Sequence, residues 1–194
     1  MRGLSDIDAA LAAIDAANAH DPNRSGDRPR AQLQGERASA WLERLAPDAS
    51  VPLRLAVRAH HLRRWAIPRD EFPDGRAGYL RWRRALKDVH ADAVREVLEP
   101  VGVDADTITR VQALVRKEGL GTDPETQTFE DVVCLVFLET QFDELADRLD
   151  DDKMVTVLRR TIPKMSAAAL ALAGDASMSP RAAALLERAL APTD

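Results

Sequence analysis

The stretch Thr122–Leu138 reads TDPETQTFEDVVCLVFL, and it decides the fold class of this chain. Its opening Asp123–Glu125 supplies a capping residue, a proline suited to the first helical turn and an acid that faces the positive end of the helix dipole. The run Val132–Leu138 is then apolar on every side, which is typical of a buried helix. We expect one long helix here that reaches about Arg148.

The rest of the chain shares this helical character. Ala, Leu, Arg and Glu are abundant, β-branched and aromatic residues are few, and Pro and Gly gather at breaks. No segment alternates convincingly with a period of two, and we find no internal repeat. The sequence predicts one all-α domain, a helical bundle over 1–174, with a last helix in 175–194 that packs on the domain or is mobile. The expected helices are 5–20, 30–45, 50–65, 79–99, 104–118, 122–148, 151–163, 166–173 and 181–191, with a mobile loop at 23–30 and a connection long enough to be functional at 66–78.

Composition excludes several classes of protein. The chain has 194 residues, 45% hydrophobic and 30% charged, which suits one folded domain and excludes a wholly disordered chain. Its single cysteine excludes a disulfide scaffold and a thiolate zinc finger, and fits a reducing cytoplasm as the expected location. No apolar stretch approaches a bilayer span and the first residues lack a signal-peptide core, so we expect no membrane association. The net charge of −5 argues against general coating of nucleic acid.

Several ionisable side chains fall where apolar ones are expected. His60 continues an apolar stripe of the third expected helix, and His61 follows it. His90 lies on the buried stripe of its own helix. Glu130 and Asp131 introduce the apolar run, so at least one carboxylate must enter the interior and needs a cation, a metal or a shifted pKa. The structural alternatives are histidines that hydrogen-bond within the core and acids that merely favour the helix dipole.

Imidazoles and carboxylates that converge from separate helices are what a divalent ion requires, and imidazole suits zinc, iron, manganese and nickel. The basic residues complement this set, because guanidinium pairs bidentately with phosphate or carboxylate, although most basic residues are typical of solvated helix faces. No Walker loop, dinucleotide glycine pattern, cysteine pair or G-x-S-x-G motif is present. Cys134, with apolar flanks, is expected to serve packing.

Five stretches resemble a known family. They are IDAANAHDPN (14–23), RAHHLRRWAIPR (58–69), GRAGYLRWRRALKDVHAD (75–92), DPETQTFEDVVCLVFLE (123–139) and DDKMVTVLRRTIPKMS (151–166). Together they are similar to the family called domain of unknown function 4202, over about residues 5–170. That family is in turn similar to the HD-domain superfamily of helical metal-dependent phosphohydrolases, whose ligand pattern is H…HD…D. The resemblance therefore implies an HD-like bundle.

Carried over by position, the resemblance implies a ligand set for a divalent metal ion. His60 matches the histidine of the HD pair, His61 stands where aspartate is usual, and Asp131, preceded by Glu130, matches the final aspartate. The first histidine of the pattern has no counterpart, because the corresponding helix offers Gln34 and Glu36. His90 is a candidate replacement ligand.

Two functions of different class follow. The first is metal-dependent hydrolysis of a small phosphorylated or nucleotide-like substrate, in which a metal-bound water attacks a phosphoryl centre. The second is a non-catalytic helical module that binds a nucleotide, an RNA end or another anionic ligand. A structural or partner-binding helical protein, with the apolar side of 181–190 as its docking surface, is a third alternative. The expected metal and catalytic residues are His60, His61 and Asp131, with Glu130 and His90 as further ligands, and the expected substrate-binding residues are Arg63, Arg64, Lys117, Lys153, Lys164, Asn18 and Asp21.

Overall fold

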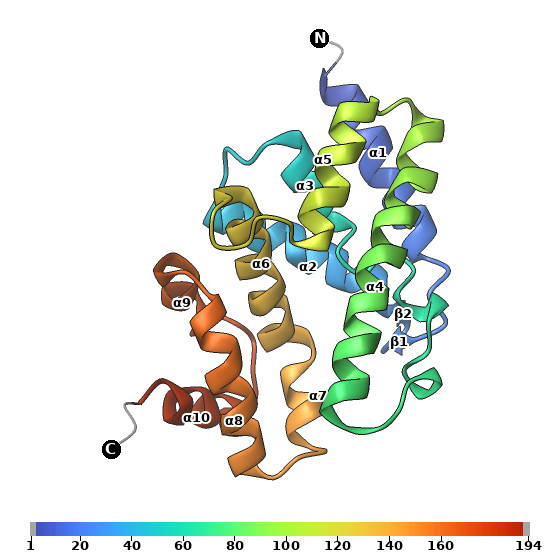
Figure 1. Cartoon of the computed structure of the whole chain (residues 1–194). Helices are drawn as coiled ribbons and strands as arrows, with labels where there is room; N and C mark the ends of the chain where they lie inside the picture. Colours follow the sequence, from blue (N-terminus) through green and yellow to red (C-terminus); the bar gives the residue numbers. More distant parts are fainter. Residues whose placement is uncertain (1–2, 192–194) are drawn as a thin grey trace.

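The chain folds as an all-α domain in which α6 runs through the middle of the helices (Figure 1). The computed structural model describes residues 3–191, so the outer ends of the expected segments 1–174 and 175–194 lie outside the described residues. The helices are α1 (Gly3–Asn18), α2 (Arg30–Leu45), α3 (Val51–Arg58), α4 (Gly75–Leu98), α5 (Ala105–Arg116), α6 (Pro124–Thr140), α7 (Phe142–Ala146), α8 (Asp151–Thr161), α9 (Ala167–Ala173) and α10 (Pro180–Leu190). Short 3-10 turns lie at Arg64–Ala66 (η1), Arg69–Glu71 (η2), Glu99–Val101 (η3) and Ile162–Lys164 (η4).

Side-chain caps start most of these helices where the sequence predicts them. The Asp123 carboxylate accepts hydrogen bonds from the backbone amides of Glu125 and Thr126, and Ser50 accepts one from Leu53. Asp104, Asp150, Ser166 and Ser179 cap their helices in the same way. Local chemistry therefore fixes the starts of six helices.

The core is built around α6, which packs against α2, α3, α5, α7 and α9. Phe129, Val132 and Leu135 on this helix are fully or almost fully buried, as the apolar run predicts. The α4 and α5 helices pack side by side, as Figure 1 shows, and α4 also contacts α1. This arrangement brings the inner face of α4 toward the first half of α6.

Two helices end earlier than the sequence predicts. The third helix ends at Arg58 instead of near Trp65, so His60 and His61 lie in the turn that follows it. Ala59 leaves the helical region with φ −88° and ψ 3°, and His60 donates a hydrogen bond from Nδ1 to the Val57 carbonyl. Arg63, at the end of this turn, adopts a left-handed φ of 53°. A side-chain hydrogen bond to the backbone thus takes the place of the regular helical hydrogen bonds in this turn.

The α6 helix ends at Thr140 rather than near Arg148. The Thr140 hydroxyl donates to the Val136 carbonyl, and Gln141 leaves the helical region with φ −131° and ψ −17°. The resulting bend starts the short α7, whose Phe142 is completely buried. The burial of this aromatic side chain is the favourable consequence of the break.

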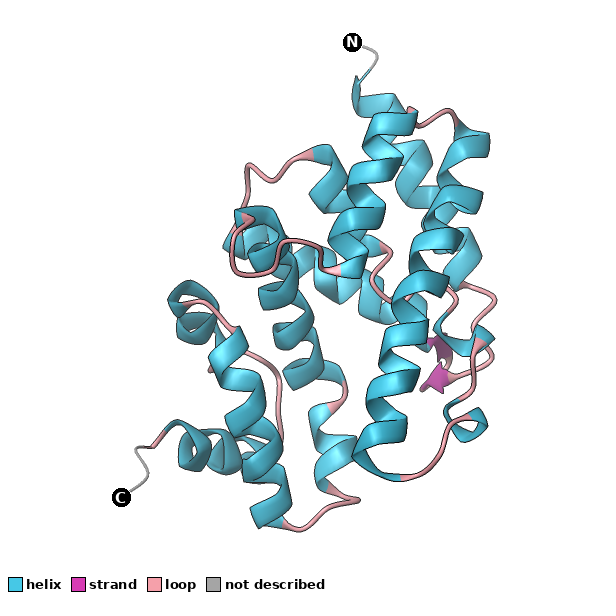
Figure 2. Ribbon diagram, in the orientation of Figure 1, coloured by secondary structure: helices cyan, strands magenta, loops and turns pink. Residues whose placement is uncertain are grey.

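The segment 23–30, expected as a mobile loop, contains a small antiparallel pair, β1 (Arg24–Ser25) with β2 (Arg28–Pro29), drawn in magenta in Figure 2. Gly26 has a φ of +57° within its turn, which glycine adopts without steric cost. Asp21 links the two ends of this hairpin, because its carboxylate accepts hydrogen bonds from the amide of Asn23, before β1, and from that of Ala31, after β2.

At the C-terminal end, α10 packs on α8 and α7. Its inner face buries Ala182, Leu185 and Leu186. Arg181 pairs with Asp151 at 2.7 Å, and Ser179 hydrogen-bonds to Asp143. Over residues 3–191, no helix combines the length and apolarity that crossing a bilayer requires.

Candidate functional site

A small cavity lies where the turn after α3 meets α4, the end of α5 and the first half of α6. It has a volume of about 30 Å³, roughly twice what one water molecule needs. It therefore has room for an ion or one small polar group. The lining residues are His60, His61, Arg64, Arg83, Leu86, Lys87, His90, Val115, Lys117, Phe129 and Val133.

Three imidazoles meet at this cavity. The ring centroids of His60 and His61 are 4.2 Å apart, and those of His61 and His90 are 6.2 Å apart. Each ring donates from Nδ1 to an oxygen: His60 to the Val57 carbonyl at 3.0 Å, His61 to Gln34 Oε1 at 2.7 Å, and His90 to the Leu62 carbonyl at 2.6 Å. These bonds fix the tautomer, so each Nε2 carries a lone pair.

Burial keeps the three imidazoles neutral. It lowers the pKa of His60 to about 3 and that of His90 to about 4, while the backbone carbonyl each ring bonds acts in the opposite direction. The pKa of His61 is also well below its usual value, first through burial and then through the neighbouring His60 and Arg64. His60 Nε2 is buried and has no hydrogen-bond partner within the described residues. The cavity thus offers unprotonated ring nitrogens at neutral pH.

Four cationic side chains line the same cavity. The Arg64 guanidinium lies 4.6 Å from the Trp82 ring centroid and 3.4 Å from His61 Nε2, and burial lowers its pKa to about 10. Arg83 and Lys87 reach the cavity from α4 at a spacing of four residues. Within 3–191, none of these three cations forms an ion pair with a carboxylate.

The fourth cation, Lys117, forms a buried ion pair with Glu130 of α6. Burial acts to raise the Glu130 pKa, but the Lys117 ammonium outweighs it, so the pKa of the carboxyl lies below its usual value. Lys117 has a φ of 61° at the end of α5, a position where glycine is usual. This left-handed backbone costs roughly 1–3 kcal/mol for a residue with a side chain, and it places the ammonium beside the cavity.

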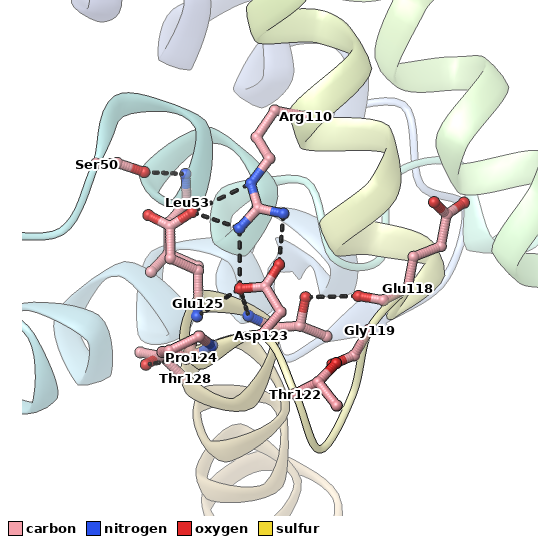
Figure 3. A network of polar contacts seen from close by, with 11 residues as sticks. Ser50, Leu53, Arg110, Glu118, Gly119, Thr122, Asp123, Pro124, Glu125 and Thr128 are labelled. Atoms are coloured by element: carbon pink, nitrogen blue, oxygen red, sulfur yellow. Dashed lines mark hydrogen bonds and ion pairs between the residues drawn. The ribbon is translucent and has the colours of Figure 1, made fainter.

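An ion-pair network shown in Figure 3 holds the loop that follows Lys117. Arg110 on α5 binds Asp123 at 2.6 and 3.0 Å, and Glu125 at 2.7 and 3.2 Å. Because Asp123 also caps α6, the network ties the ends of α5 and α6 together. The position of Lys117 between the two helices follows from this link.

Asp131 does not join the imidazoles, contrary to the expected ligand set. Its Oδ1 accepts hydrogen bonds from Gln127 Nε2 at 3.0 Å and from the Ser166 amide at 2.7 Å, next to α9. Asp131 is also absent from the cavity lining. Over the part of the chain that the structure describes, no three His, Cys, Asp or Glu side chains form a group that could hold a metal ion.

The other expected contacts divide between the cavity and the rest of the molecule. Arg64 and Lys117 line it, whereas Arg63 pairs with Glu96. The side chains of Lys153 and Lys164 are exposed, and Lys153 pairs with Asp150 at 2.8 Å.

The N-terminal polar residues lie outside the lining. Asp21 binds backbone amides, and Asn18 is fully buried with both amide atoms unpartnered within the described residues. Of the two residues that stand near the missing histidine, Gln34 accepts the His61 hydrogen bond, and Glu36 instead pairs with Arg28.

The expected substrate-binding residues do not include Arg83, although the basic residues after the histidine pair contain it, and they do not include Lys87. Both lie on the α4 face that also carries Leu86 and His90, at spacings of three, four and seven residues. Their position on an otherwise buried stripe could have indicated that they line the site. Arginines and lysines that are only solvated do not need to share a helix face with a buried histidine.

Comparison with family models supports one assignment. The model described as domain of unknown function (DUF4202) matches residues 8–186. The comparisons with curated proteins and with solved structures gave no match. The matched range includes every helix that lines the cavity. Since it spans nearly the whole chain, the chain belongs to the DUF4202 family.

Proposed function

We propose that the cavity binds the phosphate, or a similar anionic group, of a small ligand. The observation that carries this proposal is the charge of the lining. Four cations line the cavity, no Asp or Glu among the described residues does, and Arg64, Arg83 and Lys87 lack ion-pair partners there. Elsewhere in this acidic chain, many arginines pair with carboxylates, as Arg58 does with Asp15 at 2.6 Å.

The chemistry of the cations fits a tetrahedral oxyanion. A guanidinium offers paired N–H donors that match two phosphate oxygens, and lysine adds a point charge. The Arg64 side chain is held between the Trp82 ring and His61, so little conformational freedom is lost when it binds. The neutral His60 and His90 rings accept hydrogen bonds at Nε2, which suits a protonated phosphate oxygen or an ester hydroxyl group.

The test compares two adjacent arginines. Arg83 lines the cavity, whereas Arg84 is exposed on the same helix and is absent from the lining. Calorimetric titration with inorganic phosphate and with ribose 5-phosphate should show binding to the unaltered chain. Arg83→Gln should weaken it by about tenfold or more, and Arg84→Gln, with the same change in net charge, should leave it unchanged. Equal losses in the two variants, or no binding to the unaltered chain, would refute the proposal.

Metal-dependent phosphohydrolysis, which the HD-like pattern predicts, is the second candidate. One observation supports it: metal-bound histidines usually donate their other ring N–H to an oxygen, and His60, His61 and His90 all do so from Nδ1. The carboxylate that the pattern requires, Asp131, binds Ser166 instead, so the donors present do not fit the complete site. Elemental analysis of the chain purified without a metal-binding tag tests this candidate, which predicts a stoichiometric transition metal that His60→Ala removes.

A further inference from the structure

The ligand must extend beyond the cavity that holds its anionic group. A volume of about 30 Å³ takes an ion or one small polar group and not a whole nucleotide or sugar phosphate. Any larger part of the ligand therefore lies on the surface beside the lining residues. This step rests on the proposed function, in which the cavity takes the phosphate.

The α4 helix continues the cavity lining toward the surface. His90, Leu86 and Arg83 line the cavity on one face of this helix, and Tyr79 comes one turn before Arg83 on that face. Four residues of helix correspond to about 6 Å along its axis, which is less than the length of a nucleotide. Figure 1 shows α4 as one continuous helix over this range.

Tyr79 is an exposed aromatic side chain with a rigid support. The residue is 43% exposed, and its ring centroid lies 5.9 Å from that of Trp82, which is buried. The Trp82 indole donates to the Ile67 carbonyl at 2.9 Å and carries the Arg64 guanidinium at 4.6 Å from its centroid. Trp82 thus contacts both the exposed Tyr79 ring and the guanidinium of Arg64, which lines the cavity.

We propose that the ligand is a phosphate ester that carries an aromatic ring, as a nucleoside monophosphate does, and that this ring packs on Tyr79 while the phosphate enters the cavity. Base stacking on an aromatic side chain tolerates any base, because every base has a π-face. The combination of cations and one exposed ring therefore distinguishes nucleotides from simple phosphates without requiring hydrogen bonds to a particular base.

The experiment compares three probes by calorimetry: adenosine 5′-monophosphate, ribose 5-phosphate and inorganic phosphate. The unaltered chain should bind the nucleotide about tenfold more tightly than ribose 5-phosphate, since stacking on one aromatic side chain typically contributes roughly 5- to 100-fold. Tyr79→Ala should remove this difference and leave the affinity for ribose 5-phosphate unchanged, and Tyr79→Phe should keep the difference. Leu80→Ala is the matched control, because Leu80 is 54% exposed and adjacent in the chain.

Tyr79 is the single tyrosine of the chain, so its nitration gives a second readout. The nucleotide should protect it from tetranitromethane, and ribose 5-phosphate should not. Equal affinity of the unaltered chain for the two esters, or equal losses for both in Tyr79→Ala, would overturn this inference. If the esters still bind in a manner that requires Arg83, the proposed phosphate site survives that result. Absence of binding by all three probes would overturn both.

Discussion

Acidification should destabilise this protein strongly, because three imidazoles are buried in the neutral form. The unfolded chain releases them to water, where the ordinary pKa of histidine is 6.5, whereas the folded pKa is about 3 for His60 and about 4 for His90. Between pH 6.5 and about 4 the unfolded state therefore binds more protons than the folded state. The free energy of unfolding must then fall as the pH falls through this window.

The magnitude follows from the linkage relation. From pH 6.5 down to pH 5, each such imidazole lowers the free energy of unfolding by about 1.36 kcal/mol per pH unit, or about 2 kcal/mol in total. His61, whose folded pKa also lies well below 6.5, acts in the same direction. His60 and His90 together contribute roughly 4 kcal/mol of destabilisation at pH 5, a large part of the 5–15 kcal/mol that stabilises a typical domain.

Urea denaturation between pH 7.5 and pH 5, with a chelator present, measures this dependence. His90→Asn keeps a donor for the Leu62 carbonyl but does not titrate, so its pH dependence should be smaller by about 2 kcal/mol. His60→Leu should show a similar decrease. His20, which is exposed, is the control, and His20→Gln should behave as the unaltered chain. A variant at His90 or His60 with undiminished pH dependence would refute the assignment of neutral, buried imidazoles.

Three further substitutions test the packing around the site. Lys117→Gly relieves a left-handed backbone but leaves Glu130 buried without its cation, so urea denaturation should show a free energy of unfolding that is lower by about 3 kcal/mol. Adding Glu130→Gln to this variant should restore most of that loss. A single variant more stable than the unaltered chain would contradict this reasoning. Asp131→Ala leaves the Ser166 amide without its acceptor and should cost about 1–3 kcal/mol without changing phosphate affinity in calorimetry, whereas lost affinity at unchanged stability would place Asp131 at the site. Leu135→Ala, in the centre of α6, should cost about 2–5 kcal/mol in urea denaturation, and a smaller loss would mean that the core around α6 is loosely packed.

The starts of helices with a side-chain cap could be predicted because their causes are local, whereas α4, which lacks such a cap and is expected from Tyr79, begins at Gly75. Asp123 caps α6 and Ser50 caps α3 within three residues of themselves. The ends of helices were predicted less well, because distant groups determine them. The turn after α3 is held partly by His90, whose Nδ1 donates a hydrogen bond to the carbonyl of Leu62, 28 residues earlier in the chain. A local sequence pattern cannot indicate a hydrogen bond over that separation.

The candidate site shows the same division. Histidines on apolar faces predicted that imidazoles would be buried, and His60, His61 and His90 do meet at one cavity. The direction of the Asp131 carboxylate could not be predicted, because its partner Ser166 lies 35 residues later, in the turn before α9. A buried carboxylate needs a partner, but the sequence does not specify which one. Here the Ser166 amide and Gln127 Nε2 donate to it.

The position of Asp131 outside the cavity gives the two candidate functions different electrostatic consequences. A divalent cation beside the Nε2 atoms of the imidazoles would lie among the unpaired charges of Arg64, Arg83 and Lys87, with no carboxylate in the lining to offset their repulsion. An anion in the same cavity removes that repulsion. If elemental analysis detects a bound metal, the affinity of the chain for that metal should therefore rise when phosphate is present. Metal binding that is unaffected by phosphate would mean that these cations do not act on the imidazoles, and the argument for an anion site would then fail with it.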